Sequence, residues 1–236
     1  MNAKRGFVPE DERNFSPEAV ETMRRASRHI LYLINEGYDL KSAATFTGNH
    51  FLLSERQRMA IMRSIGKSER IKDRISKKIP LTELSGKEVW IDGFNTIITL
   101  EVMLSDSILL DCMDTCVRDL AALRGTYRLI PETDGAAAMM LSLLKEAGVS
   151  RANILLDAPV SNSGRLKTRI AELGEDFPGD LNIEVIKDVD RALYDKDLVI
   201  TSDAIILDHC ALWTGLTDEC LKRLGKEGIR VWDSFS

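Results

Sequence analysis

The sequence predicts an α/β protein: a mostly parallel β-sheet covered by helices, preceded by a small all-helical region. After residue 80, short apolar segments alternate with segments of helical periodicity, which is the pattern of a parallel sheet with helices on both faces. Before residue 80, apolar residues recur only at helical spacing. Ile79-Pro80 marks the boundary, because a residue before proline disfavours helix. We therefore expect two domains, residues 1–80 and residues 81–236.

Start and stop signals define the helices of the first region. Ser16-Pro17 is a helix start, with Ser as N-cap and Pro at the first helical position, and Gly37 ends that helix. A second short helix fits residues 40–46. A capping box at Ser54–Gln57 opens a third helix, which Gly66 closes.

Arginines on the third helix leave two interpretations open. Short helices joined by a tight turn, with Arg56, Arg58 and Arg63 on the third, suggest a helix-turn-helix reader of nucleic acid. The alternative is a small bundle that packs on the main domain, its arginines solvated.

The second region reads as five strands and five helices. The expected strands are residues 88–91, 153–156, 183–186, 198–201 and 229–232, and the expected helices are residues 96–104, 109–123, 134–147, 164–173 and 216–224.

Charge is distributed unevenly along the chain, whose net charge is −5. Residues 1–80 hold 16 Lys and Arg against 10 Asp and Glu, and the remainder holds 16 against 27. This balance favours a first region that meets phosphate and a second that holds cations. No apolar run approaches the roughly 18 residues that span a bilayer, and no secretory signal is evident. We expect a cytoplasmic protein that does not contact membranes.

The four cysteines are expected to be buried, reduced thiols. A Cys/His metal site can be drawn from Cys112, Cys116 and the His209-Cys210 pair, with the first two on one face of the expected helix. However, the close Cys-x-x-Cys pairs typical of zinc sites are absent.

Three expected strands end in an aspartate: Asp92, Asp157 and Asp203. The carboxyl ends of parallel strands line the crevice where open sheets bind ligands. Three carboxylates meeting there repel one another unless they are protonated or neutralised by a cation. Oxygen ligands favour Mg²⁺ or Mn²⁺. The alternative is that each aspartate caps the helix or turn that follows it.

Further ligands for such a cation come from neighbouring segments. Asn95 follows the first strand closely, and a helix-borne acid can complete the site. Glu101, Asp114 and Asp119 are all candidates for this acid. Arg118, between the last two, is a candidate for substrate binding.

The loop after the second long strand is a candidate phosphate site. Its Ser and Asn side chains, with a glycine that opens a helix, form an anion-friendly helix N-terminus; a plain capped turn is the alternative. The residues are Ser161, Asn162, Ser163, Gly164 and Arg165.

The segment Trp90-Ile91-Asp92-Gly93-Phe94-Asn95, with Thr201-Ser202-Asp203, resembles the PIN-like and NYN nuclease superfamily. More closely, the whole chain resembles a prokaryotic family, domain of unknown function 434. The stretches that carry this resemblance are residues 37–43, 56–60, 91–101 and 157–164. The resemblance implies a three-layer PIN-like fold and a divalent metal for phosphodiester hydrolysis. By the superfamily pattern Asp92 and Asp203 are metal ligands and Asn95 is their neighbour; a further aspartate has two possible equivalents, Asp208 and Asp218.

The resulting expectation is a Mg²⁺- or Mn²⁺-dependent nuclease that acts on RNA, with Asp92, Asp157 and Asp203 as catalytic residues. Two alternatives stay open: a non-catalytic nucleic-acid-binding protein on a degenerate PIN-like domain, and a small-molecule phosphatase or nucleotide hydrolase that uses the Ser161–Gly164 loop.

Overall fold

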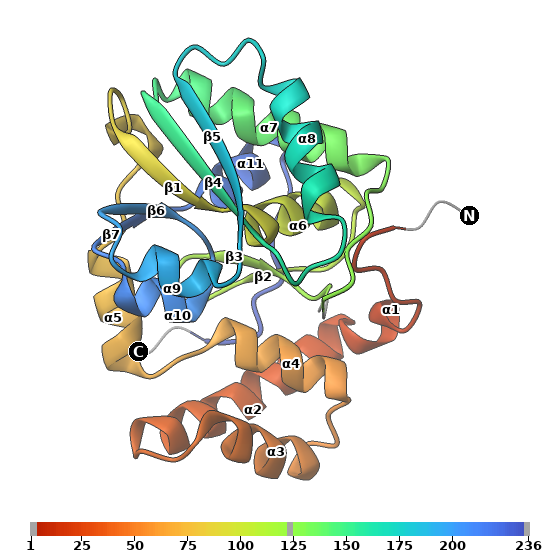
Figure 1. Cartoon of the computed structure of the whole chain (residues 1–236). Coiled ribbons are helices and arrows are strands. Elements are labelled where there is room, and N and C mark those ends of the chain that lie inside the picture. Colours follow the sequence, from red (N-terminus) through yellow and green to blue (C-terminus); the bar gives the residue numbers. More distant parts are fainter. Residues whose placement is uncertain (1–3, 122–124, 234–236) are drawn as a thin grey trace.

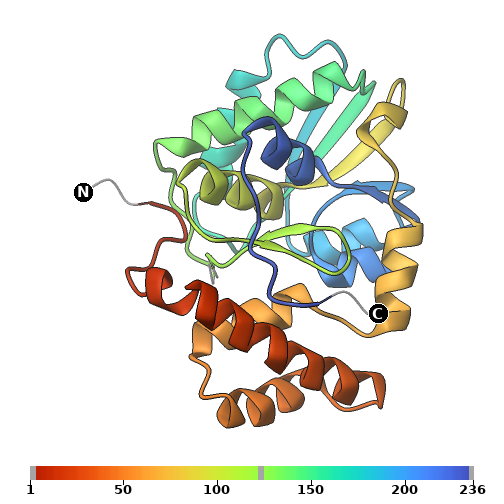
Figure 2. The same cartoon turned by 180° about the vertical axis from the view of Figure 1, so that it is seen from behind.

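The structure is a computed structural model that describes residues 4–121 and 125–233 (Figures 1 and 2). An N-terminal helical region lies beneath an α/β region in the view of Figure 1. The helices of the first region are α1 (Asp11–Asn14), α2 (Pro17–Asn35), α3 (Leu40–His50), α4 (Glu55–Ser64) and α5 (Ser68–Ser76).

Side-chain caps begin three helices of this region, α2, α3 and α4. Ser16 accepts the Ala19 N–H at the start of α2, and Asp39 accepts the Ser42 N–H at the start of α3. At α4 the Ser54 hydroxyl accepts the Gln57 N–H, and the side-chain Oε1 of Gln57 accepts the Ser54 N–H at 2.9 Å. The helix starts predicted at Ser16 and Ser54 are confirmed. In the described residues no helix is both long and apolar enough to cross a membrane.

A five-stranded parallel sheet forms the centre of the α/β region, as the alternating pattern predicts. Its strands pair in the order β5-β4-β1-β6-β7, and every pairing is parallel. The strands are β1 (Glu88–Asp92), β4 (Arg151–Asp157), β5 (Asp180–Ile186), β6 (Leu198–Ile200) and β7 (Leu212–Thr214).

Helices cover both faces of this sheet, because alternate strand residues point to opposite sides. Val89 and Ile91 of β1 pack in the larger core with one set of helices, whereas Val199 of β6 and Leu155 of β4 pack in the opposite core with the other set. The first set is α6 (Gly93–Leu104), α7 (Glu132–Glu146), α8 (Ser163–Leu173) and α11 (Leu216–Arg223), and the second is α9 (Val189–Tyr194) and α10 (Ala204–His209). The result is three layers.

The strand order contains a topological switch point. From β1 the chain adds β4 and β5 on one side, then returns to add β6 and β7 on the other. Loops that leave β1 and β6 therefore diverge, and the carboxyl ends of these two strands flank a crevice of the kind that binds ligands in open α/β sheets.

The helix expected over residues 109–123 is wrong. The chain instead forms a hairpin of β2 (Leu109–Asp111) and β3 (Val117–Asp119); residues 122–124 lie outside the described ranges. The Cys112 N–H donates to the Cys116 carbonyl at 3.1 Å, and Thr115 takes a positive φ of 65° in the turn. Tertiary packing overrides helical spacing here, because Leu110, Cys112 and Leu120 are buried against the helical region.

Four further differences concern short elements. The strand expected over residues 229–232 is only an isolated bridge between Ile229 and Leu110. Helices α9 and α10 and strand β7 were not expected. Each has six residues or fewer, so none spans enough turns or alternations to show a periodicity.

Candidate functional site

Asp92 lies at the switch point, as the last residue of β1 and the N-cap of α6. Its side chain is buried; Oδ1 accepts the Asn95 N–H at 3.3 Å and Oδ2 accepts the Thr201 hydroxyl at 3.0 Å. Burial, and then the charge of Asp203, raise the pKa of Asp92 to about 8. At neutral pH this carboxyl is therefore mostly protonated, and a bound cation would have to displace that proton.

Gly93 permits this geometry. A Cβ at this position would lie 2.8 Å from the Leu155 carbonyl oxygen and 2.7 Å from a methyl group of Leu156. Only glycine therefore lets α6 begin directly against β4, which fixes Asp92 at the strand end.

Asp203 follows β6 and caps α10. Its Oδ1 accepts the N–H groups of Ile205 and Ile206 at 2.8 and 3.2 Å. The Asp203 N–H donates to the Thr201 hydroxyl at 3.0 Å, and the same hydroxyl donates to Asp92. Thr201 thus joins the two strand ends. Asp92 and Asp203 both cap the helix that follows them, and they also lie close enough for their charges to interact. Capping a helix and converging at the strand ends are therefore compatible roles for these two aspartates.

Asn95, an expected metal ligand, holds the neighbouring turn. Its Oδ1 accepts both the N–H and the hydroxyl of Ser202 at 2.9 Å. The amide oxygen is therefore engaged in the structure, and direct coordination of a cation would require it to release Ser202.

Asp157 ends β4, two residues beyond Leu155, the register partner of Asp92. Burial raises the pKa of Asp157, and the charge of Asp188 raises it further. The pKa of Asp190 is raised by burial and then by Asp203, Asp157 and Asp188. Asp190 therefore links Asp157 to the Asp92–Asp203 pair. We call these five aspartates, Asp92, Asp157, Asp188, Asp190 and Asp203, the acidic edge.

Sequence reasoning missed Asp188 and Asp190. A signal for them exists, because both come shortly after β5, within the first residues that follow the strand. The signal is weak, because β5 is only partly apolar.

The acidic edge suits a hydrated cation better than an all-protein cage. Across residues 4–121 and 125–233, no three His, Cys, Asp or Glu side chains are close enough together to hold a metal ion. Mg²⁺ commonly keeps several waters and uses one or two carboxylates together with substrate phosphates. Asp92 and Asp203 fit such a partial set of ligands.

Glu101, one of the candidate helix acids, has a different environment. It is fully buried in α6, where its carboxylate accepts the Tyr127 hydroxyl at 2.6 Å, the Thr133 hydroxyl at 2.5 Å and the Arg5 Nε–H at 2.8 Å. These three partners anchor the N-terminal segment and the chain around Tyr127. Both of its oxygens are thus committed to protein groups.

Asp114 and Asp119 lie on the β2–β3 hairpin, not on a helix. Asp114 is fully buried and accepts both Nη groups of Arg118 at 2.9 and 2.6 Å and Nη1 of Arg74 at 2.9 Å. Burial alone would raise the pKa of Asp114, but Arg118 and then Arg74 hold it below its usual range. Asp119 accepts the Thr99 hydroxyl at 2.9 Å. Neither joins the acidic edge.

Arg118, expected to bind substrate, is occupied by the protein itself. Besides pairing with Asp114, it donates from Nε to the Ser202 carbonyl at 2.6 Å and from Nη1 to the Arg63 carbonyl at 3.0 Å. It therefore fixes the turn that carries Asp203. Asp208 pairs with Arg74 and Asp218 with Lys78, so neither acts as a further aspartate of the acidic edge.

The expected phosphate loop holds another segment of the chain. The Ser161 hydroxyl accepts the Tyr127 N–H at 2.8 Å and donates to the Tyr127 carbonyl at 3.0 Å, and the Asn162 amide donates to the same carbonyl at 2.6 Å. Ser163 is buried, whereas Gly164 and Arg165 are exposed at the start of α8. The side chains of Ser161 and Asn162 therefore bind the backbone of Tyr127.

The four cysteines are buried and free, as expected. Cys112 and Cys116 flank the turn of the hairpin rather than sharing a helix face. Burial raises the pKa of the Cys112 thiol to about 11, which makes it a poor metal ligand at neutral pH.

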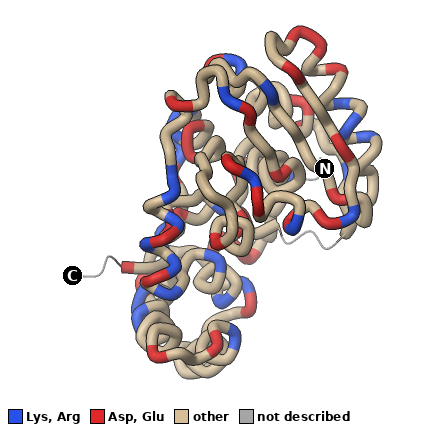
Figure 3. The backbone as a smooth tube through the Cα atoms, turned by 60° about the vertical axis from the view of Figure 1, so that its left-hand side comes forward, with Lys and Arg blue, Asp and Glu red and all other residues tan. Residues whose placement is uncertain are grey.

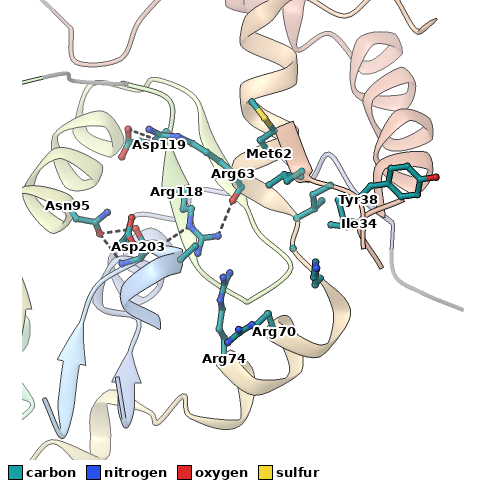
Figure 4. Close-up of a pocket in the computed structure, with 16 residues that line it drawn as sticks. Ile34, Tyr38, Met62, Arg63, Arg70, Arg74, Asn95, Arg118, Asp119 and Asp203 are labelled. Carbon is teal, nitrogen blue, oxygen red and sulfur yellow. Dashed lines mark hydrogen bonds and ion pairs between the residues drawn. The ribbon is translucent and has the colours of Figure 1, made fainter. Parts of the chain in front are cut away.

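A pocket of about 380 Å³ lies between Asp203, one residue of the acidic edge, and the helical region (Figure 4). Its lining includes five basic residues and two aspartates, in a chain of net charge −5. In Figure 3 basic and acidic positions lie side by side where the two regions meet. From the α/β region come Asn95, Arg118, Asp119, Ser202, Asp203 and Ala204; from the helical region come Ile34, Tyr38, Leu40, Met62, Arg63, Ile65, Gly66, Lys67, Arg70 and Arg74.

Two family models match different parts of the chain. Residues 22–77 match the family described as Protein of unknown function (DUF434), and residues 81–219 match Domain of unknown function (DUF5616). The resemblance to the first family, expected over the whole chain, is thus limited to the helical region.

A curated relative matches across both regions. The chain is 34% identical over 186 residues to Uncharacterized protein MJ0935 of Methanocaldococcus jannaschii, covering 79% of this chain and 89% of that protein. No solved structure matches. The chain therefore belongs to the family described as Domain of unknown function (DUF5616), and its residues 22–77 match the DUF434 model.

Proposed function

We propose that the protein is a metal-dependent nuclease that hydrolyses phosphodiester bonds of RNA, and that its α/β region is a PIN-like domain. One observation carries the proposal. Asp203, whose charge acts on Asp92 at the β1–β6 switch point, lines a pocket whose other wall is basic. A phosphodiester needs both: cations to attract its negative backbone and a carboxylate-held metal at the reacting phosphate.

Each residue of the site has a defined part in this proposal. Asp92 and Asp203 hold Mg²⁺ or Mn²⁺, while Asp190 and Asp157 add negative charge beside them. A metal bound there would activate a water and stabilise the leaving oxygen. Thr201 orients Asp92, and Arg118 orients the Ser202–Asp203 turn through the Ser202 carbonyl.

The test is cleavage of labelled single-stranded RNA and DNA by the purified protein with Mg²⁺ or Mn²⁺. We expect RNA cleavage that EDTA abolishes, and at least a ~10²-fold loss of rate in Asp92→Asn and Asp203→Asn, because one charged group at a reacting centre contributes that much. Asp176→Asn, at an exposed position of the α8–β5 loop, is the control. Absence of cleavage with both metals, or full activity in Asp92→Asn, would refute the proposal.

A non-catalytic nucleic-acid-binding protein on the same scaffold is the second candidate. It is favoured by the finding that, in the described part of the chain, no three ligand side chains gather. This candidate predicts salt-sensitive RNA binding that survives both EDTA and Asp203→Asn, without cleavage.

A further inference from the structure

Two basic residues of the pocket, Lys67 and Arg70, differ from the other three. Arg74 and Arg118 are buried and bonded to Asp114, and Arg63 lies 3.5 Å from Asp119. In the ranges that the structure describes, neither Lys67 nor Arg70 has an ion-pair partner. Their charges are therefore the uncompensated ones of the pocket.

The contacts of Arg118 and Arg74 fix the position of Lys67 and Arg70 relative to the acidic edge. Arg118 bonds the carbonyls of Ser202 and Arg63, so it ties the turn before Asp203 to the C-terminal end of α4. Arg74, on α5 with Arg70, bonds Asp114 of the hairpin and Asp208 of α10. In Figure 4 Arg70 and Arg74 lie on one side of the pocket and Asp203 on the other.

We propose that Lys67 and Arg70 bind a backbone phosphate of a single-stranded nucleic acid whose neighbouring phosphate lies at the acidic edge. This inference rests on the proposed function and adds a second contact point, on the helical region. A pocket of about 380 Å³ has the size of sites for small ligands and admits one strand. A duplex, whose major groove alone is about 12 Å wide, is too thick to enter it.

The apolar part of the lining supports a nucleotide rather than a free anion. Ile34, Met62 and Ile65 line the same pocket as the two cations. The exposed Tyr38 lines this surface as well. A base can stack on its ring while its phosphate meets Lys67 and Arg70, and this combination of an aromatic ring and cations is used by proteins that bind single strands without reading their sequence.

The test is binding of a short 5′-labelled single-stranded oligouridylate to the full-length protein in EDTA, followed by fluorescence anisotropy at several salt concentrations. We compare wild type, the double variant Lys67→Ala/Arg70→Ala, and the charge-matched control Lys145→Ala/Lys167→Ala, which removes exposed lysines from α7 and α8. The proposal predicts that only the first double variant loses ~10-fold or more in affinity and that its slope of log K against log salt falls by about 1. A duplex of the same length should bind wild type more weakly.

Equal affinity and equal slope in the Lys67/Arg70 variant and wild type would overturn the inference, as would tighter binding of the duplex. The result is separable from the cleavage test. If wild type binds through Lys67 and Arg70 but cuts nothing, this subsite stands and the nuclease proposal falls. If wild type cuts RNA and the double variant binds normally, the nuclease proposal stands and this subsite falls.

Discussion

Replacing Asp92 with asparagine should stabilise the metal-free protein above neutral pH. The pKa of the buried Asp92 carboxyl is about 8, against about 3.9 for an unfolded aspartate. Because the folded-state pKa is the higher one, the stabilising contribution is complete below pH 4 and is lost as the pH rises through 8. A shift of about four pKa units corresponds to at most ~6 kcal/mol of lost stability at high pH.

The expected gain in the variant is smaller than this upper bound. Asparagine removes the charge and can still accept the Asn95 N–H and donate to Thr201, the two partners of Asp92. However, part of the pKa shift of Asp92 comes from its repulsion with Asp203. This part depends on both aspartates, so it is not a property of Asp92 alone. We therefore expect a net gain of about 2 kcal/mol at pH 8.5, or roughly 4–8 °C in melting temperature for a chain of this size.

The assay is thermal unfolding in EDTA at pH 5, 7 and 8.5, followed by circular dichroism, with Asp176→Asn as the control for the loss of one exposed charge. The difference between Asp92→Asn and wild type should be largest at pH 8.5, smaller at pH 7 and smallest at pH 5, because the loss of stability of the wild type grows as the pH rises from the unfolded-state pKa to the folded-state pKa of Asp92. A wild type that is the more stable protein at pH 8.5, or a difference that does not change with pH, would refute the reasoning.

Three further predictions concern residues that support the site. Arg118→Met leaves the fully buried Asp114 short of one counter-charge, so it should cost about 3–5 kcal/mol in urea unfolding; an unchanged midpoint would contradict this. Glu101→Leu removes the acceptor of three buried donors, including Arg5, and should lower the stability by at least ~2 kcal/mol. It should also make the N-terminal segment cleavable by trypsin in the folded protein. Trypsin resistance equal to that of the wild type would argue against anchoring of this segment by Glu101. Gly93→Ala places a Cβ 2.8 Å from the Leu155 carbonyl and should cost about 1–3 kcal/mol, whereas the exposed Gly164→Ala, whose Cβ would meet nothing within 4 Å, should cost less.

The sheet and its acids could be predicted because both depend on local rules. A buried parallel strand reads as a short apolar run, and a polar residue directly after it lies at the carboxyl end of the sheet. Asp92 and Asp203 met both conditions and are neighbours at the switch point. The rule indicates Asp188 and Asp190 less clearly, because β5 is only partly apolar and Lys187 comes directly after it. The metal and catalytic roles of these residues stay predictions.

The roles of Asp114 and Arg118 could not be predicted in the same way. Their four-residue spacing fits one face of a helix as well as a turn of a hairpin, and the choice depends on burial of Leu110 and Leu120 against α2 and α4, elements far away in sequence. Likewise, no local pattern indicates that the Glu101 carboxylate accepts a hydrogen bond from Arg5, about a hundred residues earlier in the chain.

The hairpin also determines where this chain can be cut. The two family matches meet between residues 77 and 81, which invites expression of the second part alone. Such a fragment would expose Leu110, Met113 and Leu120 to water and leave the Asp114 carboxylate without Arg74. The parts of the chain that match the two families therefore share one hydrophobic core. A fragment beginning at residue 81 should aggregate under conditions in which the intact chain does not.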